Sequence, residues 1–300
     1  TYIFRSELPD NLKALFRPVT MVTPDQLLIC ENMLLSEGFH DSKRLACKID
    51  KLYQLSKEQL SKQHHYEWGL RSIKSVLSAA GLLKRQNPDM PEDMILMKAM
   101  RDINMPKFIN DDAVLFEGLI KDLFPTLEHD SNEGEEFKNL IINVTKSLNY
   151  EVIEGQLNKV QQMFEVMNIR HSTLICGPPV SGKSCILDIL KKTIEQLRST
   201  TVNTYIINPK AQTIPRLYGI KNEMTGDFEI GILANIFATA NQPLTPGKNE
   251  LRWVLLDGDI DPIWIENMNS VMDDSKCITL ENKDRILMQK FCSLLLEYSN

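Results

Sequence analysis

The chain has 300 residues, of which 43% are hydrophobic and 25% are charged, and its formal net charge is −6. This composition is ordinary for a globular protein and allows an apolar core of normal size. The acidic balance gives no general attraction to nucleic acid or to anionic membranes, so we expect neither as a partner. The apolar runs are far shorter than a membrane span, which argues against a transmembrane helix.

The length indicates two domains. The six cysteines are scattered, and none forms a CxxC pair. This spacing favours reduced, mostly buried thiols in the cytoplasm and argues against a disulfide framework or a zinc site. The N-terminus lacks the apolar core of a signal peptide. Because the chain begins with Thr1 rather than Met, we expect it to be a piece of a longer protein.

Most of the first half is predicted to be helical. Apolar residues recur at helical spacing in the ranges 45–55, 66–77 and 94–100. A further short helix is predicted before Pro125. The methionine stripe at 94–100 is interpreted as core, because Met fills irregular gaps between helices.

The acidic stretch EHDSNEGEE at 128–136 is predicted to be a solvated linker between two domains. Beyond it, short and continuously apolar strands alternate with helical patterns. The expected strands are 172–177, 203–208 and 253–257. Such strands indicate a parallel sheet covered on both faces. The predicted fold class is therefore α/β, with a helical subdomain followed by a P-loop parallel-sheet domain.

The segment GPPVSGKS matches the phosphate-binding pattern GxxxxGKS and lies between an expected strand and an expected helix at about 183–197. Backbone N–H groups near the start of that helix can converge on phosphate oxygens. Lys183 is expected to reach the β- and γ-phosphates, and Ser184 is expected to bind Mg²⁺. The predicted nucleotide-binding residues of this turn are Gly177, Pro178, Pro179, Val180, Ser181, Gly182, Lys183 and Ser184.

Asp257 ends the apolar strand WVLLD, where a P-loop ATPase holds Mg²⁺ through water. The alternative is an aspartate that only caps the next helix. Most such ATPases have a glutamate next, but here the residue is Gly258. Asp259 and Asp261 follow, and Asp261 is predicted to cap a helix. Because loss of a general base costs about 100-fold to 10,000-fold in rate, we expect the site to bind ATP and barely hydrolyse it, with no catalytic residue in this chain.

Several long segments resemble the dynein heavy chain, in its axonemal form. RSELPDNLKALFRPV (5–19) and the GLR-containing YEWGLRSIKSVL resemble the end of the first AAA+ module, and RWVLLDGDIDPIWIENMNSVMDD (252–274) resembles the second. The resemblance implies these domains: 1–28, the end of the first large subdomain; 29–127, its helical lid; 128–136, the linker; and 137–300, the truncated nucleotide-binding subdomain of the second module.

The resemblance also implies functions. Arg71 matches a sensor arginine that touches the nucleotide of the neighbouring hydrolytic module, and Arg17 is a candidate for an arginine that faces an adjacent module. The implied cofactors are ATP or ADP with Mg²⁺. The implied partners are the other AAA+ modules, dynein intermediate and light chains, and microtubules through other regions. The implied location is the cytoplasm, the cytoskeleton and the axoneme of cilia.

One departure concerns the tail. From about Gln289 the sequence is expected to differ from the family, which predicts a second module without its late strands and lid. Two other interpretations stay open: a stand-alone P-loop ATPase or kinase, and a structural fragment with an empty site.

Overall fold

The computed structural model describes residues 9–13, 15–17, 19–22, 24–125, 132–222, 224–245, 247–273 and 275–299. The chain divides into two compact units, Thr1–Ala99 with Val114–Phe124, and Met100–Ala113 with Pro125–Asn300. The linker at 128–136 stays a prediction, because 126–131 lie outside the described residues and the next helix begins at Asn132. Within the described ranges, no helix combines the length and apolar character needed to cross a bilayer.

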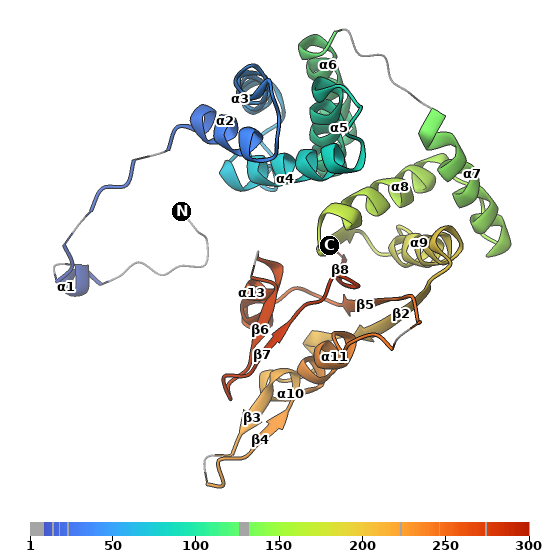
Figure 1. The fold of residues 1–300 in the computed structure, drawn as a ribbon. Helices are drawn as coiled ribbons and strands as arrows, with labels where there is room; N and C mark the ends of the chain where they lie inside the picture. The colour runs from blue at the N-terminus through green and yellow to red at the C-terminus, as the bar shows by residue number, and fades with distance from the viewer. Residues whose placement is uncertain are drawn as a thin grey trace. The chain divides into compact units, whose positions relative to one another are not determined.

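The first unit is built from helices (Figure 1). They are α1 (Asp10–Lys13), α2 (Gln26–Ser36), α3 (Ser42–Gln59), α4 (Leu70–Gln86) and parts of α5 (Glu92–Asn104) and α6 (Asn110–Leu123). The 3₁₀ turn η1 (Met105–Lys107), which lies between α5 and α6 in the sequence, belongs to the second unit. The core confirms the predicted helical spacing, because Ile49, Leu52, Ile73 and Leu77 are all at most 1% exposed. Met97 is also buried, as the packing interpretation predicts.

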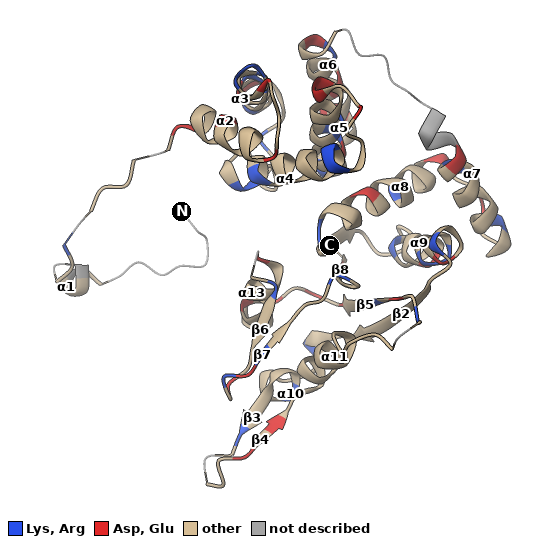
Figure 2. Ribbon diagram, in the orientation of Figure 1, with Lys and Arg blue, Asp and Glu red and all other residues tan. Residues whose placement is uncertain are grey.

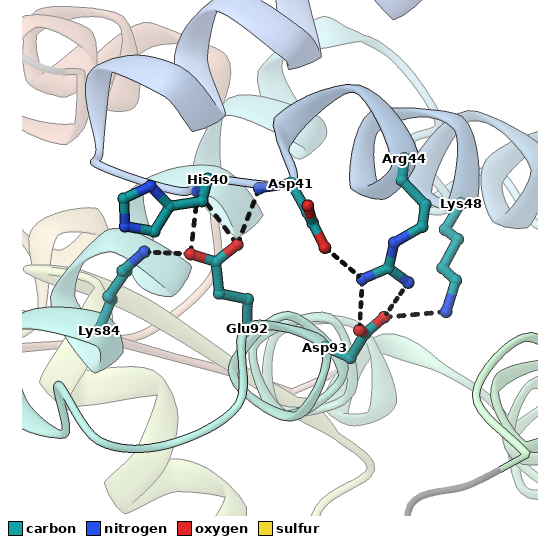
Figure 3. A network of polar contacts seen from close by, with 7 residues as sticks. All are labelled: His40, Asp41, Arg44, Lys48, Lys84, Glu92 and Asp93. Atoms are coloured by element: carbon teal, nitrogen blue, oxygen red, sulfur yellow. Dashed lines mark hydrogen bonds and ion pairs between the residues drawn. The ribbon is translucent and has the colours of Figure 1, made fainter.

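Glu92, the first residue of α5, ties that helix to the turn before α3 (Figure 3). Its carboxylate accepts hydrogen bonds from the backbone amides of His40 and Asp41 at 2.9–3.1 Å, and from Nζ of Lys84 at 2.5 Å. Burial alone would raise the pKa of Glu92, but the bonds from Lys84 and the two amides outweigh it and lower that pKa below its ordinary value. The charged form of Glu92 therefore stabilises this unit.

Asp93, the next residue, binds two cations of α3 (Figure 3). Its carboxylate lies 2.6 Å from Nη2 of Arg44 and 2.9 Å from Nζ of Lys48. The hydrogen bonds from Arg44 are the largest cause of a lowered pKa for Asp93, and Lys48 lowers it further. Two consecutive carboxylates thus fix the start of α5 against α3 and α4.

The second unit contains a parallel sheet of four strands in the order β1-β8-β5-β2. Its strands are β1 (Ser172–Gly177), β2 (Thr201–Ile207), β5 (Glu250–Asp257) and β8 (Cys292–Ser299). All three predicted strands are confirmed, and so is the α/β fold class.

The fourth strand corrects the expectation about the tail. Residues from about Gln289 were expected to be atypical and to leave the sheet without late strands, and that expectation is wrong for β8. This strand lies between β1 and β5, paired with both in parallel register. Leu294, Leu295 and Leu296 are nearly fully buried, because a central strand of a covered sheet needs apolar side chains on both faces.

Helices cover both faces of the sheet, as predicted. Leu294 and Leu296 pack in one apolar cluster with α10 (Ile214–Tyr218) and α11 (Ile232–Ala240). Leu295 packs in the other cluster. That second face is covered by α7 (Asn132–Ser147), α8 (Glu154–Ile169) and α9 (Lys183–Arg198).

The remaining elements are short. They are α12 (Pro262–Ile265), α13 (Asn269–Met272), the 3₁₀ turns η2 (Pro209–Ala211) and η3 (Glu266–Met268), and the hairpins β3 (Gly219–Lys221)–β4 (Phe228–Ile230) and β6 (Cys277–Thr279)–β7 (Arg285–Leu287). Basic and acidic residues are interspersed along α3 and α9 (Figure 2), so charge singles out neither of these helices as a surface of one sign.

Candidate functional site

The residues predicted to bind a nucleotide form one turn that joins β1 to α9. Two residues of this turn have left-handed backbone conformations, Val180 with φ 67° and Gly182 with φ 85°. Gly182 is also the N-cap of α9. A Cβ atom added at Gly182 would come 2.9 Å from Nε2 of Gln156, so a side chain there would press on α8. The turn therefore brings backbone N–H groups, with no side chain at Gly182, to the start of a helix, which suits the binding of a phosphate.

Lys183 lies inside this turn rather than reaching into solvent. Its Nζ atom donates hydrogen bonds to the carbonyl oxygens of Gly177 and Pro178, each at 3.0 Å, and the residue is only 7% exposed. Two of the predicted residues, Gly177 and Pro178, thus bind the ammonium of a third. Their contact with a nucleotide stays a prediction.

Strand β5, whose last residue Asp257 is predicted to hold Mg²⁺, ends next to a carboxylate that is not among the predicted site residues. Asp257 closes β5, and its neighbour in register on β8 is Glu297. Oε1 of Glu297 accepts a hydrogen bond of 2.9 Å from the hydroxyl of Ser184. The carboxylates of Asp257 and Glu297 therefore lie at the carboxyl-terminal ends of neighbouring strands, and the hydroxyl of Ser184, which is predicted to bind Mg²⁺, contacts the second of them.

Gly258 occupies a crowded position. Its amide donates to the carbonyl oxygen of Glu297 at 3.2 Å, and its φ of 153° is one that residues with a Cβ rarely adopt. A Cβ at this position would lie 2.7 Å from Oδ1 of Asn208. That oxygen is fixed in turn, because it caps η2 by accepting from the amides of Lys210 and Ala211 at 3.1 and 3.3 Å.

The two aspartates that follow Gly258 have other partners. Asp259 forms a 2.5 Å ion pair with Lys210. Asp261 accepts a 3.0 Å hydrogen bond from the amide of Ile263 and caps α12, which confirms its predicted role.

Both arginines assigned through the family resemblance lie in the other unit. Arg71 is exposed in the first turn of α4, after the N-cap Gly69. Arg17 is also exposed, and the Pro18 that follows lies outside the described residues. The roles of both arginines at neighbouring sites stay predictions.

The donor set fits a magnesium nucleotide. Ser184, Asp257 and Glu297 offer oxygen ligands, which Mg²⁺ prefers. Among the described residues, no three His, Cys, Asp or Glu side chains gather into a group that could hold a metal ion. A magnesium ion here would therefore need phosphate oxygens as well, which is how nucleotide sites commonly bind it.

The sequence of this chain is similar to known motor proteins. A family model described as "Hydrolytic ATP binding site of dynein motor region" matches residues 1–184. The chain is 50% identical over 299 residues to the dynein-1-alpha heavy chain of the flagellar inner arm I1 complex of Chlamydomonas reinhardtii, covering 99% of the chain and 6% of that protein. It is 48% identical over 296 residues to dynein axonemal heavy chain 10 of Homo sapiens, covering 99% and 7%.

A ciliary dynein beta chain of Tripneustes gratilla is 45% identical over 299 residues, and the alignment covers 100% of the chain and 7% of that protein. The similarity therefore extends through the tail after Gln289, in agreement with the position of β8. The chain spans only 6–7% of the length of these curated relatives.

Proposed function

Because this chain belongs to the dynein heavy chain family, we propose that it is a segment of an axonemal motor ring, which binds ATP with Mg²⁺ at residues 177–184 and hydrolyses it little or not at all. The helices of 29–127 serve as the lid of the neighbouring hydrolytic module. The remaining modules of the ring, intermediate and light chains, and microtubules bound elsewhere in the parent are its proposed partners. Its proposed location is the ciliary axoneme, within the cytoskeleton of the cytoplasm.

The proposal rests on two features together: the turn at residues 177–184, which suits a phosphate, and the position after Asp257, which has no room for a side chain. The N–H groups at the start of α9 and the ammonium of Lys183 suit the β- and γ-phosphates. Ser184 and Asp257 suit the metal, which when bound would neutralise phosphate charge. Gly258 has no side chain to activate water, and Asn208 fills the space beside it.

Nearby acidic groups do not obviously replace the missing base. Asp259 is paired with Lys210, and Asp261 caps α12. The carboxylate of Glu297 is bonded to Ser184, on the side of the site where the metal would bind rather than at the position after Asp257. Without a base or water-positioning group, the rate falls by about 100-fold to 10,000-fold.

Single-turnover hydrolysis tests this proposal in the parent heavy chain with its other nucleotide sites disabled. We expect bound ATP to persist, with phosphate release far slower than at the neighbouring module. Rapid release from this site would overturn the proposal of a non-hydrolysing site.

A second candidate function is slow hydrolysis with Glu297 as the base, because it is the one buried carboxylate next to the turn among the described residues. The variant Glu297→Gln separates the two when single-turnover hydrolysis is measured with the site saturated by ATP and Mg²⁺. If Glu297 is a base, any residual hydrolysis disappears in the variant. If the site does not hydrolyse ATP, the already low rate stays unchanged.

A further inference from the structure

We propose that Glu297 is a positioning residue of the metal site, which holds the Ser184 hydroxyl in place and, together with Asp257, makes nucleotide binding strongly dependent on magnesium. This inference rests on the proposed function, since it requires a nucleotide at residues 177–184. It adds Glu297, on β8, to the predicted site residues of the turn at 177–184 and of β5.

The first argument is the burial of Glu297. This residue is only 8% exposed, yet its side-chain contact is the neutral hydroxyl of Ser184. In the part of the chain that the structure describes, no Lys or Arg forms an ion pair with it. A buried carboxylate is costly unless a cation or several hydrogen bonds compensate its charge. A divalent cation beside Ser184 would supply that compensation.

The second argument is the direction of the hydrogen bond. A serine hydroxyl has one hydrogen to donate and two lone pairs to offer. Because the hydrogen of Ser184 points to Oε1 of Glu297, the lone pairs of its oxygen are left for a metal ion. Glu297 therefore orients Ser184 as a ligand before the nucleotide arrives.

The third argument is the register of the sheet. Asp257 and Glu297 are paired neighbours near the carboxyl-terminal ends of β5 and β8. The turn follows the carboxyl-terminal end of β1, so the two negative charges lie on the same side of the sheet as the turn. A nucleotide without metal would bring its phosphates toward two carboxylates and be repelled. A magnesium ion bound to those phosphates would attract both carboxylates and offset the repulsion. Magnesium should therefore raise the affinity for the nucleotide more than it would if Asp257 were the one carboxylate at the site.

A titration with a fluorescent ATP analogue tests the inference in the parent heavy chain with its other nucleotide sites disabled. The affinity is measured with Mg²⁺ and again with EDTA, for the wild type and for Glu297→Gln, which keeps the shape and removes the charge. We expect the gain in affinity on adding Mg²⁺ to fall about tenfold or more in the variant, since hydrogen bonds to charged groups are among the stronger ones. Metal-free affinity should rise.

The control is Asp259→Asn, which removes a nearby exposed charge that is paired with Lys210. It should leave the magnesium gain unchanged. An equal gain in wild type and Glu297→Gln would overturn the inference and leave nucleotide binding standing. If instead the wild type binds no better than Lys183→Ala in Mg²⁺, the proposed function itself fails.

A second variant covers the case in which Glu297→Gln does not fold. Glu297→Asp keeps the charge but shortens the side chain, so its carboxylate should no longer hold Ser184 at hydrogen-bond distance. We expect a reduced magnesium gain with unchanged metal-free affinity. A gain equal to that of the wild type would overturn the positioning role.

Discussion

Oδ1 of Asn208 lies where a side chain at residue 258 would begin: a Cβ built on Gly258 would be 2.7 Å from that oxygen. Asn208 is held by its own hydrogen bonds to the amides of η2, so it cannot move away without losing a cap. A side chain at the position after Asp257 is therefore disfavoured by the contact with Asn208 and by the backbone φ of 153°. The missing glutamate is a property of the packing as well as of the sequence.

The first prediction is that a glutamate at this position does not restore hydrolysis. Gly258→Glu should leave single-turnover hydrolysis low and should lower stability, because a side chain there meets Asn208 and requires an unfavourable backbone. The smaller change Gly258→Ala should cost about 1 to 3 kcal/mol from backbone strain, with a similar contribution from overpacking. Urea unfolding of the purified chain measures the stability of both variants, and the single-turnover assay measures hydrolysis by Gly258→Glu.

Two comparisons isolate the contact with Asn208. Gly247 also has a positive φ, 86°, but a Cβ there meets nothing within 4 Å, so Gly247→Ala should cost only about 1 to 2 kcal/mol from the backbone. In a double-mutant cycle, Asn208→Ala should recover part of the loss caused by Gly258→Ala. Additive losses would contradict the proposed obstruction.

The second prediction concerns the ammonium in the turn. Lys183→Ala should weaken binding of a fluorescent ATP analogue by at least about tenfold. The variant removes the ammonium that is expected to contact the phosphates, together with its hydrogen bonds to Gly177 and Pro178. The matched control is Lys192→Ala, which removes an exposed lysine of the same helix that pairs with Glu195. Equal affinities for wild type and Lys183→Ala would favour a structural segment with an empty site.

Local patterns predict much of this fold. The strand at 172–177 and the turn after it follow from a continuous apolar run that leads into GxxxxGKS, and the structure has both as expected. The tail is where the family resemblance predicted no late strand, although β8 forms there. In CSLLLE an apolar run ends in an acid, as it does in WVLLD, and this pattern could have indicated both β8 and Glu297.

Other relationships depend on strand order, which spacing alone does not supply. Ser184 and Glu297 are 113 residues apart, and they meet because β8 enters the sheet between β1 and β5. Asn208 and Gly258 meet because they follow the paired strands β2 and β5. Sequence patterns give the strands, but the pairing that assembles the site needs the three-dimensional structure.

The third prediction is a pH dependence of the first unit. The folded-state pKa of Glu92 lies below its ordinary value, so its stabilising contribution is present above the unfolded pKa of about 4.3 and is lost as the pH falls through the folded pKa. At pH 7, Glu92→Gln should lower the free energy of unfolding by about 1 to 3 kcal/mol, because charged hydrogen bonds to Lys84 and two amides are weakened. Urea unfolding followed by circular dichroism measures this.

The difference between wild type and Glu92→Gln should shrink below about pH 4, as the wild-type carboxylate becomes protonated. Glu58→Gln, at an exposed site near the end of α3, serves as the control and should change stability by less than about 0.5 kcal/mol. A difference for Glu92→Gln that persists unchanged at pH 3 would show that its charge is not what stabilises the start of α5.

The fourth prediction concerns Arg71 and the neighbouring hydrolytic module of the parent. A guanidinium that contacts the nucleotide there would stabilise phosphate charge in the transition state, so Arg71→Ala should slow steady-state ATP hydrolysis by about 100-fold. Lys74→Ala removes another exposed cation of α4 and should have little effect. Neither change should alter nucleotide affinity at residues 177–184, because Arg71 is assigned to the other site. Unchanged hydrolysis in Arg71→Ala would remove this residue from the neighbouring site and leave α4 as a packing helix only.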